Sequence, residues 1–401
     1  MPASLFATVE LAPRDPILGL TEQYNADPNP AKINLGVGVY LDDKGQLPVL
    51  QCVAAAEAAL HSSAKPKAYL PIDGLPAYDR AVQGLVFGAD SAAVADGRVA
   101  TVQAIGGTGG LKLGADFLAR LQPDALVLIS DPSWENHRGL FSQAGFEVGT
   151  YPYYDPTTRA VRFDAMLAAL KVATPGTIAV LHACCHNPTG CDLEPAQWRA
   201  VAEACAASGL TPFLDMAYQG FGNGLAEDAA ALRCFLDRGI DFLISTSFSK
   251  SFSLYGERAG ALSVVCRSAE ERARVLSQLK IMVRTNYSSP PGFGAQIVTT
   301  VLTTPELRAS WEVELGGMRE RIQAMRHALV DKLRAAGVEG DLGYITRQSG
   351  MFSYSGLSAA QMQRLRQEFG VYGLDSGRIC VAAINSGNID AVASAVAAVI
   401  D

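Results

Sequence analysis

The sequence predicts an α/β fold, with a large domain built on a mostly parallel sheet flanked by helices and a smaller α+β domain. Between residues 99 and 265, apolar runs typical of buried strands alternate with segments of helical periodicity. That alternation is the pattern of a parallel sheet covered by helices on both faces. The chain has 401 residues, 49% of them hydrophobic, which is enough for a large core and a second domain.

The chain is expected to divide into three parts. Residues 1–45 form an N-terminal arm and a small-domain segment, 46–304 the large domain, and 305–401 an interdomain helix and the C-terminal small domain. The first 30 residues are rich in Pro, Asp and Asn, so we expect an extended arm that packs on another surface, such as a second subunit. From Pro305 onward, apolar residues recur at spacings of three and four, which predicts a long helix.

Composition narrows the classes of function. The net charge of -7 argues against nucleic acid and anionic membrane as partners. The sequence shows neither an apolar run of about 18 residues nor a basic segment before an apolar block, so a cytoplasmic protein is expected. The eight cysteines are scattered through apolar runs, as is typical of reduced, buried thiols, and no metal site is expected.

The first elements of the chain contain two glycine-rich turns. A short strand at 33–40 is interrupted at Gly36 and Gly38, which indicates either a close approach to a ligand or an ordinary turn. Helices are expected near 49–60 and 76–87, then a strand at 99–105. This strand ends in Gly106-Gly-Thr-Gly-Gly110 before a helix from about Leu111. A strand, a glycine turn and a helix N-terminus favour an anion, and the spacing fits a single phosphate better than a dinucleotide.

Further strands are expected at 125–131, 177–183, 211–217 and from 242, and a polar or aromatic residue follows each of them. These residues are Trp134, Asn187, Asp215 with Tyr218, and Lys250. The carboxyl ends of parallel strands share one edge of a sheet, where ligands bind, so we expect these side chains to converge. Each also has an ordinary interpretation: a packed tryptophan, a salt-bridged or capping aspartate, or a solvated lysine.

The stretch around Lys250 is the most informative one. Lys250 lies between serines, just past a strand end, and Arg258 follows eight residues later. A lysine near cationic or desolvating neighbours has a lowered pKa and can bond covalently to an aldehyde cofactor. Hydroxyls and a guanidinium are also the groups that bind phosphate.

Four motifs together resemble the fold-type I pyridoxal-phosphate aminotransferases of the aspartate and aromatic amino-acid subgroup, over nearly the whole chain. They are Cys-His-Asn-Pro-Thr-Gly at 185–190, Leu-Asp-Met-Ala-Tyr-Gln-Gly-Phe at 214–221, Ser-Phe-Ser-Lys-Ser-Phe-Ser-Leu-Tyr-Gly-Glu-Arg-Ala-Gly at 247–260, and Asn-Tyr-Ser-Ser-Pro-Pro at 286–291.

The resemblance implies pyridoxal 5'-phosphate as cofactor and a role for each matched residue. Lys250 would bind the cofactor covalently and then move the proton from the substrate's α-carbon. Asp215, supported by His137 and His182, would keep the cofactor's ring nitrogen protonated. The other cofactor-binding residues would be Gly107, Thr108, Trp134, Asn187, Tyr218, Ser247 and Arg258, with Tyr69 from the partner subunit.

The resemblance also implies how substrate binds. Arg378 would bind the α-carboxylate in a bidentate contact, beside Trp134 and Asn187, with Gly38 on the lid. Arg284, from the partner subunit, would meet the side-chain carboxylate of a dicarboxylic substrate. Residues shared across chains imply a two-fold homodimer.

The subgroup leaves the amino donor open. Leu41, Leu47 and Ser289 stand where aspartate-specific relatives often have polar or amide side chains. The sequence around Tyr255 is also more similar to that of the aromatic enzymes. Thr108, in contrast, is the residue common in aspartate enzymes. We therefore expect a ping-pong aminotransferase for tyrosine and phenylalanine that also accepts aspartate, with 2-oxoglutarate as acceptor. A dedicated aspartate aminotransferase is the first alternative. A decarboxylase or lyase on the same scaffold and a cofactor-binding transcription regulator are the others.

Overall fold

A seven-stranded sheet forms the centre of the molecule. The computed structural model describes residues 4–13, 15, 17–63 and 66–400. The strand order is β2-β10-β9-β8-β7-β3-β4, and only β10 runs antiparallel to its neighbours in the sheet. The strands are Val99–Ile105 (β2), Leu126–Asp131 (β3), Glu147–Pro152 (β4), Ile178–His182 (β7), Thr211–Met216 (β8), Phe242–Ser247 (β9) and Ala259–Val265 (β10). The predicted mostly parallel sheet is confirmed.

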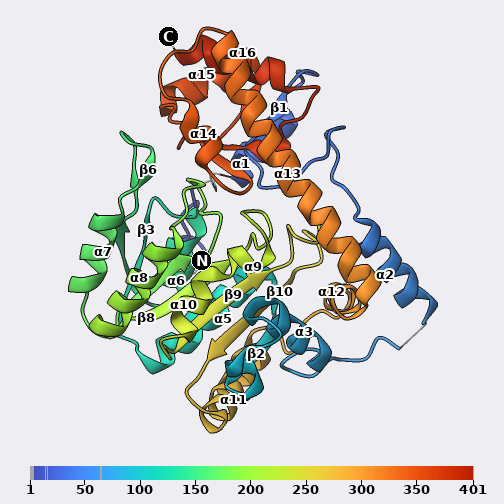
Figure 1. The fold of residues 1–401 in the computed structure, drawn as a ribbon, viewed down its shortest axis with the longest axis vertical. Coiled ribbons are helices and arrows are strands. Elements are labelled where there is room, and N and C mark those ends of the chain that lie inside the picture. Colours follow the sequence, from blue (N-terminus) through green and yellow to red (C-terminus); the bar gives the residue numbers. More distant parts are fainter. Residues whose placement is uncertain (1–3, 14, 16, 64–65, 401) are drawn as a thin grey trace.

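Helices cover both faces of this sheet (Figure 1). One layer holds Gly106–Leu121 (α5), Glu135–Gln143 (α6) and Ala269–Asn286 (α11), and the other holds Pro76–Phe87 (α3), Phe163–Val172 (α7), Pro195–Ser208 (α8), Ala230–Leu236 (α10) and Phe293–Thr303 (α12). Alternate side chains of β2 point to opposite faces of the sheet. Ala100, Val102 and Ala104 belong to the hydrophobic cluster beneath α5, while Val99 belongs to the cluster on the opposite face. Short elements complete this part of the chain: Ala92–Ala95 (α4), Tyr154–Asp155 (β5), Ala160–Val161 (β6) and Leu225–Asp228 (α9).

The long helix Pro305–Ala335 (α13) connects the large sheet to a smaller C-terminal unit (Figure 1). It begins with proline at its first turn and buries a stripe that includes Trp311, Leu315 and Ile322. The C-terminal unit contains Gly343–Arg347 (α14), Phe352–Tyr354 (β11), Ala359–Phe369 (α15), Val371–Tyr372 (β12), Arg378–Cys380 (β13), the 3₁₀ turn Val381–Ala383 (η1) and Ile389–Ile400 (α16).

The N-terminal segment returns to this C-terminal unit. Ile33–Asn34 (β1) pairs in parallel with β12, and Gln51–Ser62 (α2) packs beside α13. The three-part division of the chain stays a prediction. Among the described residues, every helix is too short or too polar to cross a bilayer.

Four local expectations from the sequence were wrong. The arm is not extended throughout, because Leu18–Ala26 (α1) is helical and Asp15 caps its first turn. α5 begins at Gly106 rather than Leu111, since Gly106 at φ +65° turns the chain directly from strand into helix. The polar composition of 284–292 predicts a loop, but Arg284 lies in the last turn of α11. The apolar run at 377–383 predicts a strand, but that strand ends at Cys380.

Candidate active site

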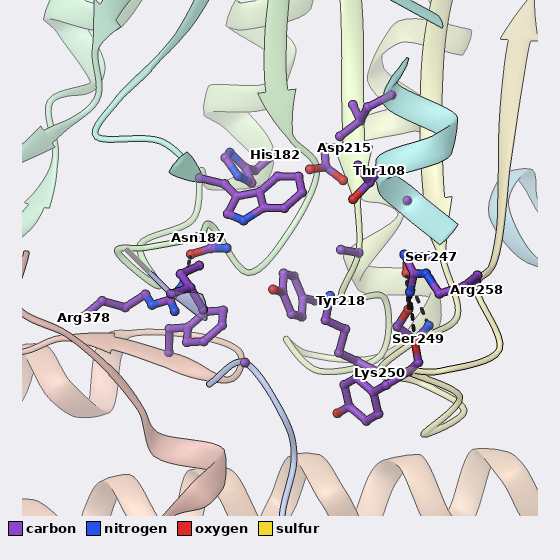
Figure 2. A pocket seen from close by; sticks show the side chains of 18 residues that line it. Thr108, His182, Asn187, Asp215, Tyr218, Ser247, Ser249, Lys250, Arg258 and Arg378 are labelled. Carbon is purple, nitrogen blue, oxygen red and sulfur yellow. Dashed lines mark hydrogen bonds between the residues drawn. The ribbon is translucent and has the colours of Figure 1, made fainter. Parts of the chain in front are cut away.

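The carboxyl ends of the parallel strands open into a cavity of about 200 Å³ (Figure 2). Its walls come from β7, β8, β9, the start of α5 and the C-terminal unit. The lining includes eleven of the thirteen site residues expected from sequence, all but Tyr69 and Arg284: Gly38, Gly107, Thr108, Trp134, Asn187, Asp215, Tyr218, Ser247, Lys250, Arg258 and Arg378. His182 lines it too, so the predicted convergence at one sheet edge is present in the structure.

Asp215 provides a buried negative charge at one end of the cavity. It stands near the end of β8, where its Cα is paired with that of His182 on β7. Nε2 of His137 donates to Oδ2 of Asp215 at 3.0 Å, and Oγ of Ser133 lies 2.9 Å from Nδ1 of the same ring. Burial alone would raise the pKa of Asp215, but the hydrogen bond and charge of His137 hold it below its ordinary value. The carboxylate is therefore ionised at neutral pH.

His182 contributes a neutral imidazole beside this carboxylate. Burial, then the nearby His137, lowers its pKa to about 3. Among the described residues, neither of its ring nitrogens has a hydrogen-bond partner. Its ring lies 4.3 Å from that of His186, which in turn stacks on Tyr153 at 3.9 Å. A buried imidazole with unpaired nitrogens at a cavity wall is a site for a polar atom of a ligand.

Lys250 provides the amine, which projects between Tyr218 and the serines in Figure 2. Its Nζ lies 4.9 Å from the centre of the Tyr218 ring. Burial, together with Arg258 and Arg378, lowers the pKa of Lys250 to about 8 against the opposing effect of Asp215. A much larger fraction of this amine than of an ordinary lysine is therefore neutral, and nucleophilic, near neutral pH.

A third group of residues forms a cradle for an anion. Gly107 and Thr108 belong to the first turn of α5, where backbone N–H groups point outward. Nη1 of Arg258 donates to Oγ of Ser249 at 3.4 Å, and Oγ of Ser247 donates to the same oxygen at 3.2 Å. A guanidinium, hydroxyls and a helix N-terminus on one wall form the donor set that binds phosphate.

Two glycines favour close packing at this cradle. A methyl group at Gly106 would lie 2.4 Å from Nη2 of Arg258, and one at Gly107 would lie 3.1 Å from Cβ of Ser247. The absence of side chains at both positions lets the helix N-terminus approach the arginine and the serine closely.

A second cation stands at the opposite end, on the side of the C-terminal unit. Arg378, at the start of β13, is 1% exposed. It donates from Nη1 to Oδ1 of Asn187 at 3.2 Å and from Nη2 to the carbonyl of Gly36 at 2.8 Å. Its guanidinium lies 4.3 Å from the ring centre of Phe352, and its Nε has no partner within the described chain. A buried guanidinium without a carboxylate contact fits a carboxylate ligand.

Two predicted residues lie outside this cavity. Tyr69 is 95% exposed, and Arg284 is exposed with Nη1 donating to Oγ of Ser288. Conversely, sequence reasoning missed several lining residues: Ile17, Leu111, Ala217, Ser249, Tyr255 and Phe352. Ser249 and Tyr255 lie inside the motif around Lys250 and could have been found, whereas Ile17 and Phe352 come from distant segments with no local signal.

The donor set fits pyridoxal phosphate. The cradle suits its phosphate, the ionised Asp215 suits a protonated ring nitrogen, and the amine of Lys250 suits its aldehyde. Trp134 lines the same space, and its ring makes a T-shaped contact with that of His137 at 5.3 Å between ring centres.

Comparison with known proteins agrees with this geometry. Residues 30–396 match the family model for class I and II aminotransferases. The chain is 58% identical to an aspartate aminotransferase of Pseudomonas aeruginosa (99% of this chain, 100% of the relative) and 53% identical to an aromatic-amino-acid aminotransferase of Escherichia coli (98% and 100%). Among solved structures, it resembles an aromatic-amino-acid aminotransferase from Burkholderia pseudomallei covalently bound to pyridoxal phosphate, with 61% identity, full coverage of both chains and a TM-score of 0.98.

Proposed function

The chain belongs to the class I and II aminotransferases and is a pyridoxal-phosphate-dependent transaminase; on this premise we propose that its amino donors are tyrosine, phenylalanine and aspartate. The acceptor in this proposal is 2-oxoglutarate, and the two half-reactions alternate in ping-pong order. The single observation that carries the proposal is one cavity that holds the Lys250 amine, the Asp215 carboxylate and a phosphate cradle.

Each predicted residue that lines the cavity has a place in the proposed chemistry. When bound, pyridoxal phosphate supplies an aldehyde that takes up an amino group and a ring that withdraws electrons. Gly107, Thr108, Ser247 and Arg258 hold the phosphate. Asp215 keeps a proton on the ring nitrogen, because its low pKa makes the ion pair favourable. The remaining contacts come from Trp134 against the ring face and from Asn187 and Tyr218 beside it.

Proton transfer is assigned to Lys250. With pyridoxal phosphate and substrate bound, the amine of Lys250 would take the proton from Cα of the substrate. An amine whose pKa is lowered to about 8 accepts and returns a proton more evenly than an ordinary lysine at working pH. Arg378 fixes the α-carboxylate, so that Cα stays within reach of Nζ, and Gly38 closes over the substrate.

The donor preference rests on similarity and on side chains around the site. Relatives named for aspartate and for aromatic amino acids share more than half of their residues with this chain. Leu41, Leu47 and Ser289 give an apolar or small character where aspartate enzymes often have polar groups. These three residues do not line the cavity of their own chain, so in the proposal they act from its surroundings.

We also propose that the active molecule is a homodimer. Tyr69 and Arg284 are exposed and lie away from their own cavity, as side chains that complete a partner's site would be. In this arrangement Tyr69 reaches the partner's phosphate, and Arg284 meets the distal carboxylate of aspartate or 2-oxoglutarate.

A cytoplasmic location completes the proposal. All eight cysteines are free thiols, as is typical of a reducing compartment. Immunoblotting of cell fractions tests this assignment, which recovery of the protein in a non-cytoplasmic fraction would overturn.

Replacement of Lys250 tests the catalytic assignment. Lys250→Ala removes both the covalent attachment and the base, so kcat/KM for every donor should fall by at least about a thousandfold. The visible absorbance of the purified enzyme should be lost as well. A wild-type enzyme that stays colourless with added cofactor, or a variant of normal activity, contradicts the proposal.

Specificity constants separate the two substrate classes. We expect kcat/KM for phenylalanine and tyrosine to equal or exceed that for aspartate, with 2-oxoglutarate as common acceptor. A preference of more than about a hundredfold for aspartate would support a dedicated aspartate aminotransferase. Two observations favour this alternative: the similarity to the Pseudomonas aeruginosa enzyme and the presence of Thr108.

A further inference from the structure

We propose that Gln103 is a positioning residue for the neighbouring chain's active site, because it joins the two surface loops that carry Tyr69 and Arg284. The inference rests on the proposed function, in which two copies of the chain complete one another's sites. The two loops are defined as the 67–75 loop, before α3, and the 284–293 loop, which runs from the last turn of α11, where Arg284 stands, to the first residue of α12.

Gln103 is an unusual residue for its position. It lies in the apolar strand β2 and is 1% exposed. Burying an amide side chain is costly unless its donors and acceptor are paired, so its partners indicate what the residue stabilises. Those partners lie in the two loops rather than in the core.

The 67–75 loop is fixed by two hydrogen bonds. The backbone N–H of Gln103 donates to the carbonyl of Asp73 at 2.8 Å, and the N–H of Leu75 donates to Oε1 of Gln103 at 3.4 Å. Between them, Gly74 has φ +105°, and a methyl group there would lie 2.4 Å from Cβ of Gln103. The loop therefore lies directly on the glutamine.

The 284–293 loop is fixed by the remaining groups of the same residue. Nε2 of Gln103 donates to the carbonyl of Pro291 at 2.6 Å. The hydroxyl of Tyr287 donates to the backbone carbonyl of Gln103 at 3.3 Å. Backbone and side chain together thus bond to both loops, two contacts to each.

The loops also contact each other above Gln103. A methyl group at Gly292 would lie 3.6 Å from Cδ1 of Leu70, and Nζ of Lys67 lies 5.6 Å from the ring centre of Phe293. Lys280 of α11 forms an ion pair with Asp73 at 3.0 Å. Tyr69 and Arg284 are exposed and do not line their own cavity, so in the proposal a shift of the loops alters the partner's site and leaves the chain's own cavity intact.

Hybrid dimers distinguish this role in trans from a general structural one. In the reference hybrid, a wild-type chain pairs with a Lys250→Ala chain, which leaves one working site, and the two chains carry different affinity tags. In the trans hybrid, Gln103→Met is added to the Lys250→Ala chain, whose loops cover the working site. In the cis hybrid, it is added to the chain that keeps Lys250. Methionine preserves the shape and removes the side-chain hydrogen bonds.

We expect the trans hybrid to show an increase of about tenfold in KM for 2-oxoglutarate, with kcat within about twofold of the reference. The cis hybrid should match the reference. Equal defects in both hybrids, a defect in the cis hybrid alone, or no defect in either overturns the proposal. Arg284→Ala in the Lys250→Ala chain of the reference hybrid tests the shared site directly. An unchanged KM for 2-oxoglutarate there overturns the shared site itself, and with it this inference, so the two failures are distinguishable.

Two further variants control the measurement. Gln83→Met makes the same chemical change at a glutamine that bonds the other end of β2, at Val99 and Thr101, and should leave both hybrids unchanged. Gln103→Glu keeps the acceptor for Leu75 but places an oxygen against the Pro291 carbonyl. It should reproduce the trans defect even where Gln103→Met folds poorly, and a normal KM in its trans hybrid also overturns the proposal.

Discussion

At the scale of single residues, the site works by setting charges through burial and a few contacts. Asp215 is buried yet ionised, since His137 donates to it. Lys250 is buried among cations, and its pKa falls to about 8. Burial holds His182 neutral beside the carboxylate. The pKa values of Asp215 and Lys250 are both lowered, so the acid stays charged while the base is more readily neutral, as acid–base chemistry at neutral pH requires.

The pKa of Lys250 predicts how cofactor uptake depends on pH. Only the neutral amine attacks an aldehyde, so the rate of uptake by cofactor-free protein should rise about tenfold per pH unit below 8 and level off above about 9. Stopped-flow absorbance at saturating pyridoxal phosphate measures this profile. Because the Asp215 carboxylate raises the pKa of Lys250, Asp215→Asn should move the midpoint to lower pH. A midpoint near 10.5 in the wild type would show that burial does not act as described.

At the scale of elements, glycines let helix α5 pack closely on the sheet. A methyl group at Gly110 would lie 2.5 Å from Oγ of Ser245, and one at Gly114 would lie 2.4 Å from Cζ of Phe213. The close contact brings the N-terminus of α5 to the ends of β9 and β10, where Ser247 and Arg258 stand. The phosphate cradle is thus a consequence of helix–sheet packing as well as of its own residues.

Alanine at Gly114 should therefore destabilise the protein by about 1–3 kcal/mol, because Phe213 must move within a packed core. Gly139 of α6 is the matched control, since a methyl group there meets no atom of the described residues within 4 Å. Gly139→Ala should be neutral or stabilise by up to about 1 kcal/mol, because alanine favours a helix. Urea denaturation of the two variants measures both effects; equal loss of stability would refute the packing argument.

At the scale of the whole molecule, the single chain leaves apolar surface uncovered. Leu5, Phe6, Val9 and Leu11 of the N-terminal segment are all more than two-thirds exposed. Tyr69 and Phe293 add apolar surface on the loops assigned to the partner's site. Several exposed apolar side chains within one short segment, as at 5–11, are typical of a surface that another chain covers.

Replacing Leu5, Phe6, Val9 and Leu11 with serine should weaken the proposed dimer, since four apolar contacts with the second chain are lost. Sedimentation velocity should show monomer at concentrations where the wild type is dimeric, and specific activity should fall on dilution. The control variant is Leu121→Ser with Val172→Ser, at positions that are 60% and 83% exposed. It should change neither property. A dimer unaffected by the four serines would contradict the assignment of this segment to the interface.

The sequence by itself determined most strands of the sheet and the residues at their carboxyl ends, whereas the edge strand β4 was not predicted. Buried strands have a continuous apolar pattern, and a polar residue at the end of each one is visible in a single chain, as at Asp215 and Lys250. Helix starts and short strands were less predictable, because Asp15 caps α1 and Gly106 turns directly into α5 through contacts that follow no period in the sequence. Only the tertiary structure brought Ile17 and Phe352 to the cavity and joined the two loops through Gln103. Such contacts depend on segments far apart in the chain, and their energies exist only once the backbone has folded.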